Sequence, residues 1–79
     1  MRVVGEIPNE ECKITIFAWN NRYIIKLEQG LLEQTFKVNE YDVVSEAELC
    51  NIIDSQFIHA AVERFKGMNI SLSDALRRA

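Results

Sequence analysis

Apolar and polar residues alternate along two segments in the first half of the chain. Residues 12–19 read Cys-Lys-Ile-Thr-Ile-Phe-Ala-Trp, an alternation rich in β-branched and aromatic residues that is typical of a strand. Asn20-Asn21 follows, and asparagine tolerates the positive φ that a type I′ turn requires. Residues 22–28 predict a second strand, Gln29-Gly30 a second turn, and residues 31–38 a third strand. The pattern therefore predicts a three-stranded antiparallel β-meander over residues 12–38.

The first hairpin can be checked by its register. A two-residue loop at 20–21 pairs positions whose numbers add to 41. One face of the hairpin is then apolar throughout and carries Ile14, Ile16, Ile25 and Leu27. The opposite, outer face sets Phe17 against Ile24 and Lys13 against Glu28. Because one face is apolar in both strands, the alternation indicates which side of the sheet forms the core.

The second hairpin has two possible registers. A loop at residues 29–30 sets Lys26 opposite Glu33. A loop shifted by one residue, to Gly30-Leu31, instead sets Glu28 opposite Glu33, and like charges directly opposite each other destabilise a strand pair. The charges therefore favour the 29–30 loop.

The second half of the chain has the pattern of helices. Ser45-Glu46-Ala47-Glu48 has the form of a capping box, and helical spacing then continues to Lys66, with Gly67 in the position of a C-terminal cap. The apolar stripe changes direction at Asp54-Ser55, which indicates either two consecutive helices or one kinked helix. Ser71 is a weaker cap for a short last helix over residues 72–79.

These elements predict an α+β fold in which a three-stranded antiparallel β-meander is followed by two or three helices packed on one face. The chain of 79 residues has the length of a single domain. Within it, residues 1–11 form a lead-in or an edge strand, residues 12–38 the meander and residues 45–79 the helical part.

Composition narrows the class of protein. The chain is 48% hydrophobic and 27% charged, as is usual for a globular domain. Its net charge of −3 disfavours nucleic-acid binding by the whole surface, because phosphates would be repelled. No apolar run is long enough for a membrane span, and the first residues lack the apolar stretch of a signal peptide. The sequence therefore predicts a cytoplasmic protein without membrane contact.

Candidate catalytic and metal-binding chemistry is sparse. Cys12 and Cys50 have no CxxC partner or neighbouring histidine, so both are interpreted as small buried hydrophobes. His59 is the only histidine, which leaves no His-rich metal site. The chain has no GxSxG, P-loop or GxGxxG motif. We therefore expect no enzymatic activity, no cofactor and no metal.

The outer face of the meander is the surface that invites a functional interpretation. Its candidate binding residues are Phe17, Trp19 and Ile24, surrounded by Lys13, Arg22 and Lys26. An exposed apolar cluster of this kind marks an interaction site. The leading hypothesis is a non-enzymatic interaction module that forms a homodimer or binds a protein partner through this face.

Two other interpretations stay open. The same aromatic and basic side chains would suit single-stranded nucleic acid, although pairing of Lys13 and Lys26 with glutamates across strands argues against it. Alternatively, the last helix or the N-terminal segment folds over the apolar cluster, and nothing binds there.

Overall fold

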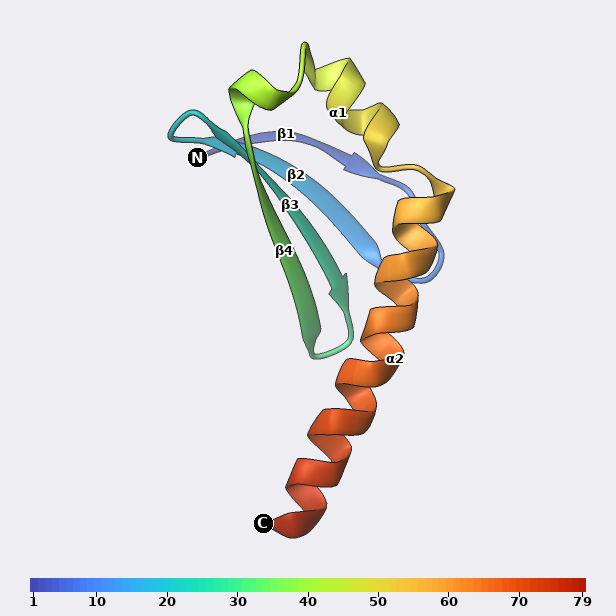
Figure 1. The fold of residues 1–79 in the computed structure, drawn as a ribbon. Coiled ribbons are helices and arrows are strands. Elements are labelled where there is room, and N and C mark those ends of the chain that lie inside the picture. The colour runs from blue at the N-terminus through green and yellow to red at the C-terminus, as the bar shows by residue number, and fades with distance from the viewer.

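A computed structural model describes all residues, 1–79, and places four strands in one antiparallel sheet (Figure 1). The strands lie in chain order across the sheet: β1 (Arg2–Ile7), β2 (Lys13–Trp19), β3 (Arg22–Gln29) and β4 (Leu32–Asn39). A short 3-10 helix, η1 (Glu40–Asp42), leads to α1 (Glu46–Ile52) and α2 (Ser55–Arg78). The predicted α+β class is confirmed, with one strand more than the predicted meander.

The additional strand is β1, formed by the segment predicted as a lead-in or an edge strand. It pairs with β2 from Arg2, opposite Ala18, to Ile7, opposite Ile14, and its register shifts between Val3 and Gly5. The bulge inserts Val4, which has no partner on β2, so Val3 and Val4 need not follow strict alternation. Pro8 follows directly and removes a backbone donor, which ends the pairing.

The first hairpin has the predicted register. Ile16 lies opposite Ile25 and Phe17 opposite Ile24. The turn residues Asn20 and Asn21 have φ angles of 57° and 63°, the left-handed conformation that both central positions of a type I′ turn require.

The second hairpin differs from the prediction. Gln29 lies opposite Leu32, so the turn is Gly30-Leu31 and Glu28 faces Glu33. Only Gly30 has a positive φ there, 59°, which fits a type II′ turn with glycine at its first central position. A 29–30 turn of type I′ would have forced Gln29 into the left-handed region. Backbone geometry therefore outweighs one exposed like-charge pair.

The like-charge pair is relieved by side-chain neighbours. The Glu33 carboxylate lies 3.6 Å from the Lys26 ammonium and accepts a hydrogen bond of 3.0 Å from the Thr35 hydroxyl. Because the observed register differs from the predicted one by two residues along β4, each side chain stays on its predicted face.

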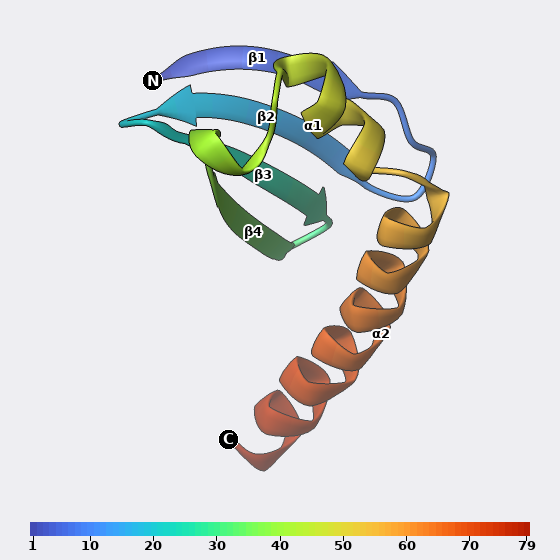
Figure 2. The same ribbon diagram turned by 45° about the horizontal axis from the view of Figure 1, so that its top comes forward.

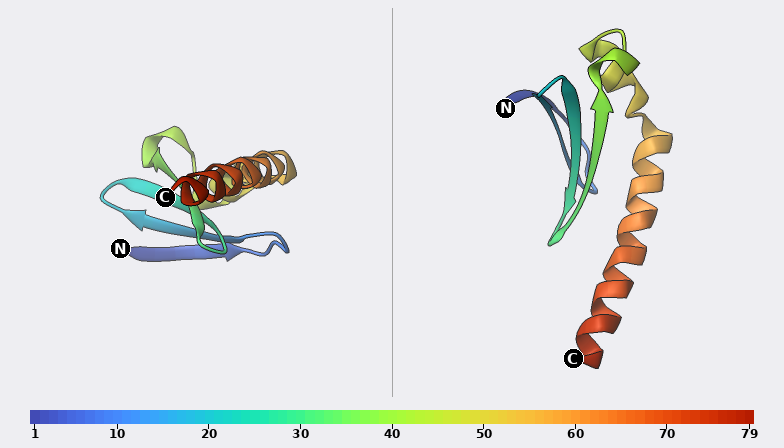
Figure 3. Two further views of the ribbon diagram at one scale, coloured as in Figure 1. Left: turned by 90° about the horizontal axis from the view of Figure 1, so that it is seen from below. Right: turned by 60° about the vertical axis from the view of Figure 1, so that its left-hand side comes forward.

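Both helices cover one face of the sheet, which we call the inner face (Figures 2 and 3). Nine residues form the core: Cys12, Ile14, Ile16, Ile25, Leu27, Leu49, Ile53, Ala61 and Phe65. A buried polar residue of β4 also contributes: the Gln34 amide donates to the Ala61 carbonyl oxygen at 2.8 Å and accepts from Arg64 Nε at 2.9 Å. These two hydrogen bonds link α2 to β4. No buried side-chain polar atom lacks a hydrogen-bond partner.

Both helices start with a side-chain cap: Ser45, as predicted, for α1, and Asp54, at the predicted change of stripe, for α2. Ser45 Oγ accepts a hydrogen bond from the Glu48 backbone N–H, and Asp54 Oδ1 accepts from the Phe57 N–H. The change in stripe direction at Asp54 is thus a break between two helices, one of the two predicted alternatives.

The predicted helix end at Gly67 is wrong, because α2 continues to Arg78. Gly67 does not have a positive φ, so it forms no left-handed cap. The apolar spacing of Phe65, Met68 and Leu72 continues in phase across the glycine, and no proline interrupts it. The last turns of α2 extend beyond the β3–β4 turn (Figure 1).

The two glycines predict opposite responses to alanine. Gly67→Ala should raise the free energy of unfolding by ~0.5–1 kcal/mol, because a Cβ there meets no atom within 4 Å and alanine is the better helix former. Gly30→Ala should lower it by ~1 kcal/mol, because alanine resists the left-handed conformation. Urea unfolding followed by circular dichroism measures both, and destabilisation by Gly67→Ala would mean that the helix ends there after all.

Candidate interaction surface

The outer face of the sheet lies open. Figure 3 shows both helices on the opposite side of the sheet from this face. The N-terminal segment does not fold over it either, because it is bound edge-on as β1. The interpretation in which the chain itself covers the apolar cluster is therefore wrong.

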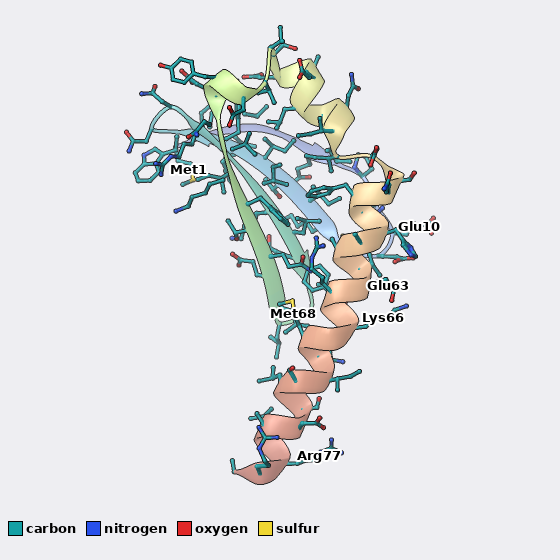
Figure 4. The ribbon with its side chains drawn as sticks, in the orientation of Figure 1. Met1, Glu10, Glu63, Lys66, Met68 and Arg77 are labelled. Atoms are coloured by element: carbon teal, nitrogen blue, oxygen red, sulfur yellow. The ribbon has the colours of Figure 1, made fainter.

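An apolar patch occupies one end of this face, beside the Asn20-Asn21 turn. Val3 lies opposite Phe17, and Phe17 lies opposite Ile24. Trp19 is 54% exposed and Val3 59% exposed, whereas Phe17 and Ile24 are half-buried. We call Val3, Phe17, Trp19 and Ile24 the outer patch. Figure 4 places Met1, which is also exposed, at the same end of the sheet.

Sequence reasoning found three of these four residues and missed Val3. The assignment of Val3 to a face depends on where β1 begins and on the bulge between Val3 and Gly5. Neither can be read from two neighbouring valines, because alternation places only one of them on each face. A bulge breaks that rule, and the sequence carries no separate signal for it apart from Gly5.

The basic residues of the face divide into two groups. Lys13 lies 4.0 Å from Glu6 and Lys26 lies 3.6 Å from Glu33, both at the end of the sheet away from the patch. The predicted partner of Lys13 was Glu28, which does lie opposite it, but the ion pair forms with the glutamate that β1 supplies. These exposed pairs neutralise charge locally and contribute little stability.

Arg22 and Lys37 form the second group and make no ion pair. Arg22 lies opposite Trp19, and Lys37 lies opposite Ile24, so both cations border the outer patch. The patch is therefore an exposed apolar surface with two free positive charges at its margin, on a chain whose net charge is −3.

The remaining candidate chemistry is dispersed. His59 lines a surface hollow together with Glu11 and Asp54, and it makes no ion pair with either. No group of three or more His, Cys, Asp or Glu side chains is arranged to hold a metal ion. Neither α-helix combines the length and the apolarity that crossing a bilayer requires.

The two cysteines have different environments. Cys12 is buried in the core, as predicted, and its burial, together with the nearby Glu11 charge, raises the pKa of the thiol. Cys50 is exposed on α1, so its interpretation as a buried hydrophobe is wrong. Its neighbour Leu49 takes the buried position of that helix turn.

The cysteine environments predict selective labelling. One thiol per chain should react with an aromatic disulfide reagent in the native protein, and the second only after unfolding in denaturant. Cys50→Ser should abolish the native reaction. Rapid native labelling of two thiols would place Cys12 outside the core.

The raised pKa of Cys12 also predicts a pH dependence of stability. Because the folded chain holds the Cys12 proton more tightly than the unfolded chain, folding should become less favourable as the pH rises past about 8.5, the ordinary thiol pKa.

Comparisons with protein-family models, with curated proteins and with solved structures find no match to this chain.

Proposed function

We propose that this chain is a non-enzymatic interaction module that binds another protein through the outer patch. The observation that carries the proposal is an exposed apolar surface, centred on Trp19, on a sheet face that nothing in the chain covers. Clusters of this kind on small domains are interaction sites, and tryptophan is among the residues that contribute most to binding energy.

The charges beside the patch indicate the chemistry of the partner. Arg22 and Lys37 carry no carboxylate partner, so an apolar surface bordered by Asp or Glu would complement both. A second copy packed face to face on the same patch would bring two Arg22 and two Lys37 side chains around one apolar contact. That like-charge crowding favours a different protein over a homodimer on this face.

Single-stranded nucleic acid is the less favoured ligand of the same surface. Stacking requires exposed aromatic faces, and Phe17 is half-buried, which leaves Trp19 alone. Two free cations also give a small electrostatic footprint on an acidic chain.

Trp19→Glu should weaken partner binding by about thirtyfold or more, the usual loss for a central aromatic residue. The partner is first obtained by affinity capture from cells that make the protein. It is then purified and titrated against the wild type and each variant by isothermal calorimetry, a readout that Trp19→Glu retains. For the wild type, the emission of Trp19, the only tryptophan, is followed as well. We expect a blue shift on binding and weaker binding at high salt.

Leu31→Glu is the matched control, because Leu31 is 99% exposed at the opposite end of the sheet. It should bind the partner as the wild type does. Equal binding by Trp19→Glu, or emission that no captured protein changes, would contradict the proposal. Quenching by an oligonucleotide that disappears as salt rises would replace it with nucleic-acid binding.

A further inference from the structure

The two edges of the sheet are built differently. The β1 edge carries a bulge and is followed by Pro8, both of which are devices that prevent a further strand from pairing. The β4 edge has neither: it pairs with β3 without a register shift along its whole length, from Leu32 to Asn39. Figures 1 and 2 show no element beyond β4 on its outer side.

The hydrogen-bonding groups that β4 turns outward follow from the ladder. The Glu40 N–H donates to the Asn21 carbonyl oxygen at 3.1 Å, and 40 and 21 continue the register of β3 and β4. Since bonded and non-bonded pairs alternate in an antiparallel ladder, even-numbered residues of β4 bond to β3. Glu33, Thr35 and Lys37 therefore point their N–H and C=O groups away from the sheet.

These three residues also make β4 complementary to itself. If two β4 strands run antiparallel with Thr35 facing Thr35, Glu33 of each copy faces Lys37 of the other. All three pairs join residues whose backbone groups point outward, so the hydrogen-bonding pattern and the charge pattern select the same register. On the inner face, Leu32 then faces Val38, and both are half-buried apolar side chains in the single chain.

We propose that the β4 edge is a homodimer interface, in which a second copy of this chain pairs antiparallel about Thr35 to give one continuous sheet. This interface uses none of the four outer-patch residues. Lys37 borders both surfaces, so its pairing with Glu33 of the second copy leaves Arg22 as the free cation beside the patch. A two-fold axis perpendicular to the sheet leaves both patches on the same side, so the dimer presents two partner-binding surfaces.

The position of the end of α2 also supports a second copy of this chain at the β4 edge. Helix α2 runs antiparallel to β4: Phe57 contacts Phe36, and Asn69 and Leu72 line a hollow beside the β3–β4 turn. In the proposed register, Leu31 of one copy lies opposite Asn39 of the other, so the second copy continues past this turn into its η1.

Exposed side chains of matching chemistry on the two copies then lie near each other, apolar beside apolar and basic beside acidic. Leu76 is exposed four residues, ~6 Å, beyond Leu72, and Tyr41 of the second copy is exposed two residues beyond its Asn39. Next to them, Arg78 makes no ion pair at the end of α2, whereas Arg77 is paired with Asp74, and Glu40 and Asp42 belong to η1. Apolar and charge complementarity at the helix end thus accompany the strand pairing.

Charge-exchange variants test the pairing. Glu33→Lys alone sets lysine against Lys37 of the second copy, and Lys37→Glu alone sets glutamate against Glu33. Each single variant should raise the dimer dissociation constant by about tenfold or more. The double variant, and an equimolar mixture of the two single variants, should restore dimerisation because both recreate opposite charges.

Sedimentation equilibrium of the full chain measures the mass, with 9.1 kDa for a monomer. Thr35→Pro is a second blocking variant: it removes an N–H that the single chain does not use, so the fold should persist by circular dichroism while the dimer is lost. Trp19→Glu is the control on the other surface and should stay dimeric.

A wild-type monomer up to millimolar concentration would overturn the β4 proposal, as would a dimer unaffected by these charges. A dimer that only Trp19→Glu disrupts would overturn it too, and would identify the outer patch as the self-association surface. Loss of partner binding with an intact β4 dimer would count against the proposed function alone.

Discussion

The burial of four aliphatic side chains on one side of β2 and β3 is the constraint on which the rest of this molecule depends. Ile14, Ile16, Ile25 and Leu27 are almost fully excluded from solvent. Burying side chains of this size supplies ~1.5–3 kcal/mol each, which is a large share of the stability of so small a domain. Because alternate residues point to opposite faces, this burial also determines which side chains stay outside, including Phe17 and Trp19. The core and the candidate binding surface thus arise from one alternation.

Both α-helices pack on the inner face, where Leu49 of α1 and Ala61 and Phe65 of α2 belong to the core. No helix is therefore left to cover the outer face. The hydrogen bonds of Gln34 determine the position of α2 along β4. Its amide satisfies a backbone carbonyl of α2 and also holds Arg64, whose guanidinium lies 5.7 Å from the Phe36 ring centre. A buried polar group needs such partners, so α2 has one favourable position along β4. With its first half held in that position, the second half necessarily extends past the end of the sheet.

Sequence reasoning succeeded where local chemistry acts without competition. Short-range rules predict the Asn20-Asn21 turn, the Ser45 cap, the change of helix direction at Asp54-Ser55 and the faces of the β2, β3 and β4 residues. The structure contains all of these features. It failed where two local signals disagreed. At Gly30 the turn conformation outweighed the charges of Glu28 and Glu33, and at Gly67 the continuing apolar stripe outweighed the glycine.

The candidate site was predictable to a similar degree. Phe17, Trp19 and Ile24 follow from the register of the first hairpin, whereas Val3 depends on a bulge whose only sequence signal is Gly5. Which lysines are neutralised was predictable only in part, since Glu6 reaches Lys13 from a strand that the alternation barely indicates. Whether the face is open or covered depends on where α2 packs, and that is a tertiary property.

The extension of α2 also governs how the molecule moves through a solvent. The chain measures 46 × 25 × 18 Å, and its radius of gyration is 14.2 Å, whereas a compact domain of this length has one of about 11.6 Å. The radius of gyration rises when a chain of constant volume becomes elongated, so the excess reflects the asymmetric shape of a single chain. In a size-exclusion column the monomer would therefore elute earlier than a compact globular protein of the same mass, and its elution position would overstate its mass.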